Sequence, residues 1–100
     1  MTILNLKPYR IFEGDGMKMK FVAIDPGEYA TGGFEVLPAN IGMEEIYSVL
    51  IQTPYSTHIK TAVWDPANSK IIMYSDWAAT EVVATTDCSG EWVRCVFIGY

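Results

Sequence analysis

Hydrophobic residues recur along this chain with a period of two, and the intervals between the hydrophobic runs are rich in Gly, Pro, Asn, Asp and Ser. Because successive side chains of a strand point to opposite faces of a sheet, this pattern predicts strands rather than helices. The predicted fold is all-β, a single-domain antiparallel β-sandwich or jelly-roll-like barrel of about eight strands that spans residues 1–100. A helical turn is expected only within residues 39–45. We expect the strands at residues 2–12, 17–25, 34–37, 46–53, 58–65, 70–75, 80–86 and 91–98.

The segments between these strands have the composition of tight turns. Residues 13–16 (EGDG) supply two glycines that can adopt a positive φ, as a hairpin requires. Residues 65–69 (DPANS) have the composition of a type I turn inside a longer hairpin loop. Acidic side chains in such turns cap backbone amides, so the carboxylates of residues 13–16 and 25–28 indicate turns rather than acid–base catalysis or a calcium loop.

Several predicted strands are hydrophobic on both faces, most clearly residues 21–24, 46–51 and 71–74. A two-layer sandwich needs only one hydrophobic face per sheet. The surplus predicts a second buried surface against another chain. The alternative is that the long loops at residues 25–33 and 37–45 fold back over the outer faces.

The length and charge of the chain narrow the classes of protein to which it can belong. One hundred residues suffice for one domain with a hydrophobic core. Seven Lys and Arg against twelve Asp and Glu give a net charge of −5, which argues against nucleic acid or an anionic membrane as partner. Lys7, Pro8 and Arg10 interrupt the only candidate signal sequence, so we expect the chain to be intracellular at synthesis.

Residues that could perform catalysis or bind a metal are scarce. His58 is the only histidine, and it alternates with Ile59 at the start of a predicted strand, which favours an exposed polar position over a catalytic base. Cys88 and Cys95 have a spacing that fits neither a cross-strand disulfide nor a zinc template built from short Cys pairs. The sequence therefore predicts two reduced thiols, no enzyme activity, no metal and no cofactor.

The aromatic residues could build a stacking platform for sugar rings or an interface between proteins. Trp64 and Trp92 fall within predicted strands, where we expect them in the core. Trp77 lies in a segment between two predicted strands. We expect its side chain to be buried as an anchor, and the alternative is a contact between subunits. Tyr29 and Tyr55 lie in predicted loops and are the candidates for exposed recognition.

Residues 1–12 predict an edge strand or an anchoring arm. Pro8 cannot donate a hydrogen bond to a ladder, so this strand belongs at an edge or outside the sheet. An edge strand can pair with a neighbouring chain through its free backbone groups. The alternative is that the segment closes its own sheet by pairing with residues 17–25.

Three segments of the chain, at residues 31–42 (TGGFEVLPANIG), 64–71 (WDPANSKI) and 80–100, together resemble small virion proteins of tailed bacteriophages. Residues 31–42 (TGGFEVLPANIG) are similar to a segment of that group in which a TGG turn leads to an aliphatic–Gly step. Residues 64–71 (WDPANSKI) resemble its hairpin, with an aromatic residue, Asp, a turn Asn or Gly, and then Lys with an aliphatic residue. Residues 80–100 resemble its carboxyl-terminal strand pair, apart from Cys88 and Trp92, where that group carries aliphatic residues.

The resemblance implies a non-enzymatic capsid decoration (cement) protein, located on the virion surface as a trimer that bridges subunits of the major capsid protein. The alternative function is a carbohydrate-binding or adhesin-type β-sandwich module that uses exposed Trp and Tyr; a small hydrolase is a third. The candidate interface residues are Ile3, Leu4, Leu6, Tyr9, Tyr29, Tyr47, Tyr55 and Trp77.

Overall fold

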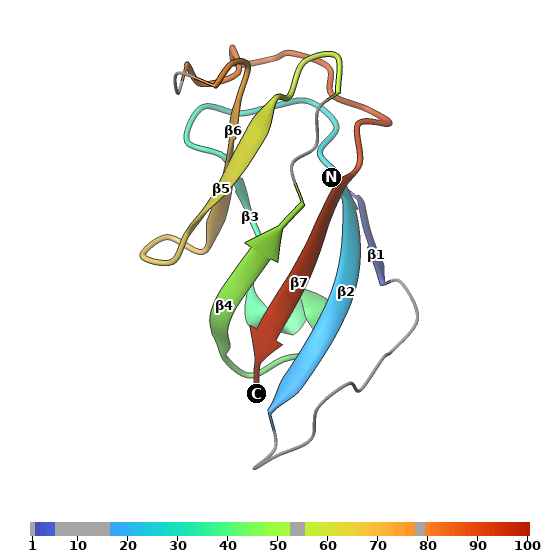
Figure 1. The fold of residues 1–100 in the computed structure, drawn as a ribbon, viewed down its shortest axis with the longest axis vertical. Helices are drawn as coiled ribbons and strands as arrows, with labels where there is room; N and C mark the ends of the chain where they lie inside the picture. Colours follow the sequence, from blue (N-terminus) through green and yellow to red (C-terminus); the bar gives the residue numbers. More distant parts are fainter. Residues whose placement is uncertain (1, 6–16, 53–55, 78–79) are drawn as a thin grey trace.

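A computed structural model describes residues 2–5, 17–52, 56–77 and 80–100, and the described residues form seven strands and one short 3-10 helix (Figure 1). The all-β class predicted from the alternating pattern is confirmed. In chain order the elements are β1 (Thr2–Asn5), β2 (Lys18–Asp25), β3 (Phe34–Glu35), η1 (Pro38–Ile41), β4 (Ile46–Ile51), β5 (Thr61–Asp65), β6 (Lys70–Tyr74) and β7 (Val93–Gly99).

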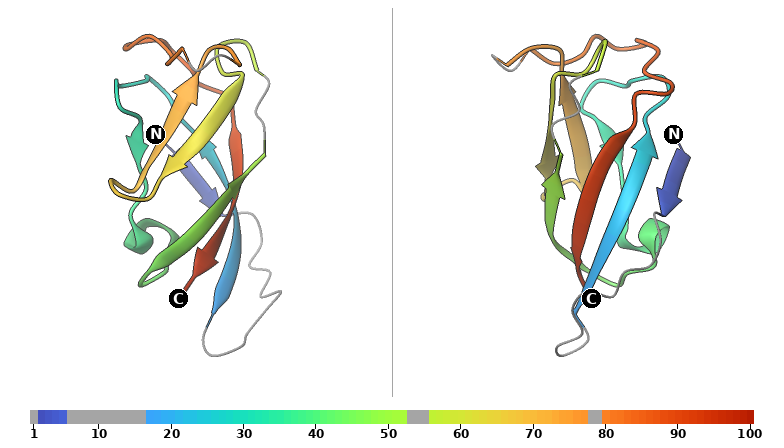
Figure 2. Two further views of the ribbon diagram at one scale, coloured as in Figure 1. Left: turned by 60° about the vertical axis from the view of Figure 1, so that its left-hand side comes forward. Right: turned by 45° about the vertical axis from the view of Figure 1, so that its right-hand side comes forward.

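The strands make two antiparallel sheets. The four-stranded sheet has the order β1-β2-β7-β4, and the three-stranded sheet has the order β3-β6-β5. Figure 2 shows the two sheets from two sides, with β4 of the larger sheet beside β5 of the smaller one. Each sheet is open, so the described strands do not close into a barrel.

The core lies between the two sheets, because each contributes the hydrophobic side chains of one face. On β7, Val93, Cys95 and Phe97 are buried and alternate with outward-facing neighbours. The Phe97 ring meets the ring of Trp64 from β5 edge to face, with 6.0 Å between the ring centroids. Complete burial of a side chain as large as Phe97 contributes about 1.5–3 kcal/mol to folding, so this pair is a main link between the sheets.

The predicted turn at residues 65–69 is confirmed and joins β5 to β6. Asp65 Oδ1 accepts a hydrogen bond from the backbone N–H of Ala67 at 3.1 Å, and Asp65 Oδ2 accepts one from the Asn68 side chain at 2.8 Å. These hydrogen bonds, the side-chain bond from Asn68 foremost, hold the pKa of Asp65 below its usual value. The turn chemistry of the sequence therefore determines this hairpin locally.

The predicted strand at residues 80–86 is wrong, and the described residues form seven strands where about eight were expected. This segment makes one isolated bridge, between Glu81 and Tyr74, and then leaves the sheet. The Val82 N–H still donates to the Met73 carbonyl of β6 at 2.9 Å, but beyond it the Thr85 N–H donates to the Tyr29 carbonyl at 2.7 Å and the Thr86 N–H to the Val83 carbonyl at 3.2 Å. Thr85 has a φ of 69°, which interrupts an extended chain.

The amino-terminal strand closes its own sheet over residues 2–5, where β1 pairs with β2 from Thr2 opposite Asp25 to Asn5 opposite Val22. It lies at the edge of the four-stranded sheet (Figure 1). Residues 6–16, which include the predicted turn at residues 13–16, lie outside the described part of the chain.

Gly33 provides a test of this packing. It has a φ of 99°, and a Cβ at this position would overlap the carbonyl oxygen of Ile71 on β6. Gly32 has a φ of 93°, but a Cβ added there would point into open space, with no other part of the described chain within 4 Å. Both substitutions by Ala therefore incur the conformational cost of a positive φ, about 1–2 kcal/mol, and only Gly33→Ala adds a backbone collision.

We expect Gly33→Ala to lower the free energy of unfolding by about 1–3 kcal/mol more than Gly32→Ala does, because backbone atoms cannot move aside as a flexible side chain can. Urea unfolding of the two variants and the wild-type protein measures the difference. Equal losses in the two variants would show that the contact between Gly33 and β6 has no energetic importance.

Candidate interaction surface

The outer face of the four-stranded sheet is hydrophobic. Phe21 of β2 lies opposite Val96 of β7, and Val96 lies opposite Leu50 of β4, so the three side chains form one row across three strands. Their sequence neighbours Val22 and Cys95 point into the core. Leu50 is 58% exposed, which is unusual for a leucine in a paired strand. The two-faced pattern predicted for residues 21–24 and 46–51 is therefore present in the structure.

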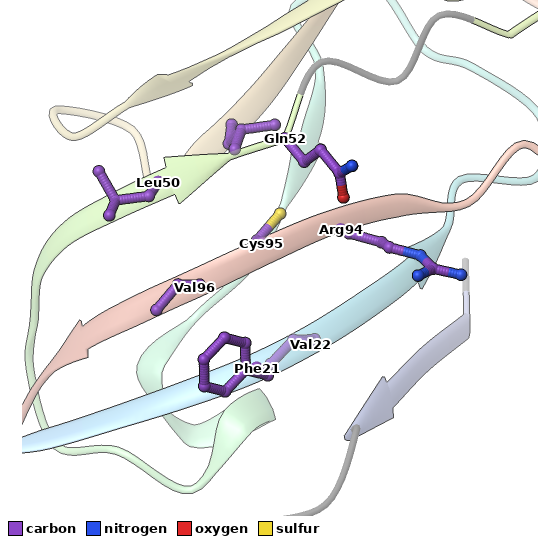
Figure 3. Close-up of a pocket in the computed structure, with 8 residues that line it drawn as sticks. Phe21, Val22, Leu50, Gln52, Arg94, Cys95 and Val96 are labelled. Carbon is purple, nitrogen blue, oxygen red and sulfur yellow. The ribbon is translucent and has the colours of Figure 1, made fainter. Parts of the chain in front are cut away.

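A groove of about 450 Å³ follows this row (Figure 3). Figure 3 shows Leu50, Val96 and Phe21 toward one end, and the polar side chains of Gln52 and Arg94 toward the other. The lining residues are Phe21, Val22, Leu50, Ile51, Gln52, Arg94, Cys95 and Val96.

A second groove, of about 470 Å³, lies on the other side of β4, between β4 and β5. Tyr47 and Val63 stand at this groove, and about half of each side chain is exposed. Tyr47 also packs edge to face against Tyr100, with 5.0 Å between the ring centroids. The lining residues are Tyr47, Ser48, Val49, Ile51, Ala62, Val63, Trp64 and Pro66. We call these two grooves together the β4 surface.

The β4 surface carries little charge. The chain contains twelve Asp and Glu in 100 residues, yet among the described residues no carboxylate lines either groove, and Arg94 is the one charged lining residue. Such a surface can meet another protein without burying an unpaired carboxylate.

Of the predicted interface residues, Tyr47 is on the β4 surface, and Tyr29 is not at any surface. The expectation of an exposed Tyr29 is wrong, because only 2% of it is accessible. Its hydroxyl donates a hydrogen bond to Glu81 Oε2 at 2.5 Å and accepts one from the Met73 N–H at 3.2 Å. Burial first, and then the bond to Glu81, raise the pKa of Tyr29 well above its usual value. Tyr29 thus attaches its loop to β6.

The tryptophans differ from prediction in two of three cases. Trp64 packs on the core, as expected. Trp92 precedes β7 and is 40% exposed, so its predicted place within a strand and the core is wrong. Trp77 is 64% exposed, which contradicts the expectation of a buried anchor. A local preference of tryptophan for strands does not reveal which side of a chain faces the core.

Two of the remaining candidate interface residues, Ile3 and Leu4, lie in β1. Ile3 is partly buried against the core, because it lies opposite Ile24 on the inner face of the sheet. Leu4 of β1 lies opposite Ala23 of β2. Leu6, Tyr9 and Tyr55 lie outside the described residues.

Sequence reasoning missed several groove residues, above all Gln52, Arg94 and Val96. The alternation in residues 91–98 places Arg94 and Val96 on one face, and that signal was available. Their proximity to Phe21 and Leu50 depends on the pairing of β7 with β2 and β4, which no local pattern specifies.

Comparison with known proteins adds no relative: no family model, no curated protein and no solved structure matches this chain. Among the residues that the structure describes, no helix has the length and hydrophobicity needed to cross a bilayer.

The buried Tyr29 hydroxyl predicts a measurable pH dependence. In Tyr29→Phe, Glu81 loses one of its two donors and keeps the Gly32 N–H at 2.7 Å, whereas the Met73 N–H loses its bond to the hydroxyl. We therefore expect the free energy of unfolding at pH 7 to fall by about 1–3 kcal/mol. The folded wild-type protein keeps the phenol proton above pH ~10, whereas the unfolded chain releases it. Wild-type stability therefore declines as the pH rises above about 10.

The variant lacks this phenol, so its stability falls less steeply over the same range; any contribution of Cys88 and Cys95 is common to both proteins. Urea unfolding of both proteins between pH 7 and pH 11 measures the two slopes. Identical slopes would contradict the hydrogen-bonded, buried state of Tyr29.

Proposed function

We propose that this protein is a non-enzymatic structural protein of a phage virion: a small β-sandwich that decorates the capsid and stabilises it by bridging coat subunits. In this proposal it acts as a homotrimer whose chains meet through the β4 surface. The main support is the hydrophobic row of Phe21, Val96 and Leu50 on the face of the sheet that points away from the core.

The distribution of charge supports a second copy of the same chain as the occupant. At a net charge of −5, copies of this protein repel each other over most of their surface. On the β4 surface this repulsion is reduced, because no carboxylate lines either groove within the described residues. Specific obligate interfaces bury roughly 2,000 Å² or more in total and resemble a protein core, and a hydrophobic sheet face of this kind matches that composition.

The virion assignment rests on the resemblance of residues 31–42, 64–71 and 80–100 to small phage virion proteins. Two structural features are compatible with it. The Gly33 N–H donates to the Ala30 carbonyl at 3.0 Å, so residues 30–33 form a turn, and the hairpin of β5 and β6 presents the Asp65 turn. The turn and the hairpin therefore agree locally with the proposed relationship.

Substitution of Leu50 tests the proposed oligomer. A carboxylate in the β4 surface would be buried without a partner at the contact with a neighbouring copy, at a cost of several kcal/mol. We expect wild-type protein to have three times the chain mass of 11.2 kDa by light scattering at micromolar concentration, and Leu50→Asp to have the mass of one chain.

The matched control is Val83→Asp. Val83 is 75% exposed and lies in the 80–86 segment, outside both grooves, so this variant should remain a trimer. Circular dichroism checks that both variants fold. A wild-type protein with the mass of one chain, or a Leu50→Asp variant that keeps the wild-type mass, contradicts the trimer through this surface.

Decoration is tested directly on capsid shells of the parent phage that lack this protein. We expect wild-type protein and Val83→Asp to bind the shells with saturation and to raise the temperature at which they disrupt. Saturable glycan binding that changes the fluorescence of the exposed Trp77 or Trp92, by a protein that does not bind the shells, would instead favour the carbohydrate-binding alternative.

A further inference from the structure

Three side chains with metal-binding chemistry meet where two turns approach each other. His58 lies in the turn before β5, and Cys88 and Glu91 lie in the turn before β7. One ligand atom from each, an imidazole nitrogen, the Sγ of Cys88 and a carboxylate oxygen, lie within 4.8 Å of one another. The two turns are separated by about 30 residues of chain and lead into different sheets.

The turn that carries Cys88 and Glu91 is held by backbone hydrogen bonds. The Cys88 N–H donates to the Gly27 carbonyl at 2.8 Å, and the Glu91 N–H donates to the Cys88 carbonyl at 3.0 Å. Gly90 between them has a φ of 80°, and its N–H donates to Asp25 Oδ1 at 3.1 Å. This tight turn brings the Cys88 and Glu91 side chains to one side.

His58 is joined to the same turn through both its backbone and its ring. The His58 N–H donates to Glu91 Oε1 at 2.6 Å, and His58 Nδ1 lies 2.6 Å from Glu91 Oε2. Burial opposes ionisation of Glu91, but the bonds from His58 and from Ser56 hold its pKa below the usual value. The next residue, Ile59, is completely buried and fixes the position of the His58 backbone.

The spacing and the donor set match the requirements of a zinc-type ion. Cys88 and Glu91 have the i, i+3 spacing of the short Cys pairs in structural zinc sites, with a carboxylate in place of the second thiolate. Zinc bonds of about 2.0–2.3 Å in a tetrahedron place ligand atoms about 3.5 Å apart, so the present separations need only small side-chain movements. Cys88 is fully buried, and the His58 side chain is 46% exposed, which leaves an entry path from solvent.

The surroundings of the thiol are negatively charged. Burial and, after it, the carboxylates of Glu91, Asp87 and Asp25 together raise the pKa of Cys88 to about 11. The same three carboxylates reduce the cost of placing a cation beside the thiol. When the metal–sulfur bond forms, the thiol proton leaves to solvent, and His58 ligates through Nδ1 with its remaining proton on Nε2.

We propose that His58, Cys88 and Glu91 bind one zinc ion or a similar divalent transition metal, with the fourth coordination position open to water. This proposal departs from the expectation of no metal site, and it is independent of the proposed virion function. A bound ion would connect the turn before β5 to the turn before β7. It would thereby stabilise the folded state in proportion to the logarithm of the metal concentration above the dissociation constant.

Cobalt(II) titration of the reduced protein tests the proposal, because a cobalt–thiolate bond gives an intense near-ultraviolet charge-transfer band. We expect one cobalt ion per chain, with this band, in wild-type protein and in Cys95→Ser. Cys95 is the matched control, since it is also a buried free thiol but lies on β7 outside the cluster. Cys88→Ser should lack the band, and zinc should displace cobalt from the wild-type protein.

Two further variants decide the question if Cys88→Ser does not fold. His58→Ala and Glu91→Gln should weaken zinc affinity by roughly 100-fold or more, because loss of even an outer-sphere partner costs about 10–100-fold. The control Glu44→Gln changes an exposed carboxylate outside the cluster and should bind zinc like the wild-type protein. Absence of the cobalt band in wild-type protein, its persistence in a folded Cys88→Ser, or unchanged affinity in both His58→Ala and Glu91→Gln would overturn the proposal.

Discussion

The pairing of β7 with β2 on one side and β4 on the other is the constraint on which the rest of the structure depends. Both edges of β7 form hydrogen bonds with neighbouring strands, and its side chains point alternately to the two faces of the sheet. On one side Val93, Cys95 and Phe97 form the centre of the core. The other side must then meet solvent or another molecule, and there the strand presents Arg94, Val96 and Ile98.

This arrangement explains why the β4 surface is hydrophobic without being part of the core. The row from Phe21 through Val96 to Leu50 crosses three strands that are already paired within the sheet. The core beneath it is filled by the opposite faces of the same strands, together with β5 and β6. The hydrophobic outer face therefore lies outside the core of the chain, and an exposed face of this composition is typical of a surface that contacts another molecule.

Several carboxylates of this acidic chain accept hydrogen bonds that hold turns in place. Asp25 accepts hydrogen bonds from Gly27 and Gly90, Asp65 accepts them within its hairpin, and Asp87 accepts one from Ser89. Asp25 thus connects the loop after β2 to the turn before β7. Glu91 has a different role, because it binds the His58 backbone and ring and holds them beside Cys88.

Local sequence pattern was enough to predict the all-β class, the places of the longer strands β2, β4, β5, β6 and β7 to within a few residues, and the turn at residues 65–69. These features depend on alternation and on the conformational preferences of Pro, Asn and Asp, which act over a few residues. The two-faced pattern also indicated a hydrophobic outer surface, although it did not say which strands would share it.

Long-range contacts decided the pairing order, the loss of the expected strand at residues 80–86, the burial of Tyr29 and the exposure of Trp77 and Trp92. They also brought His58 to Cys88 and Glu91 from a turn about 30 residues away. The Tyr29 hydroxyl is buried because Glu81 and Met73 satisfy it, and a buried polar group is tolerated only where such partners exist. Local pattern specifies which residues can form a strand, whereas the competition among distant hydrogen-bond and packing partners specifies where each strand and each side chain finally lies.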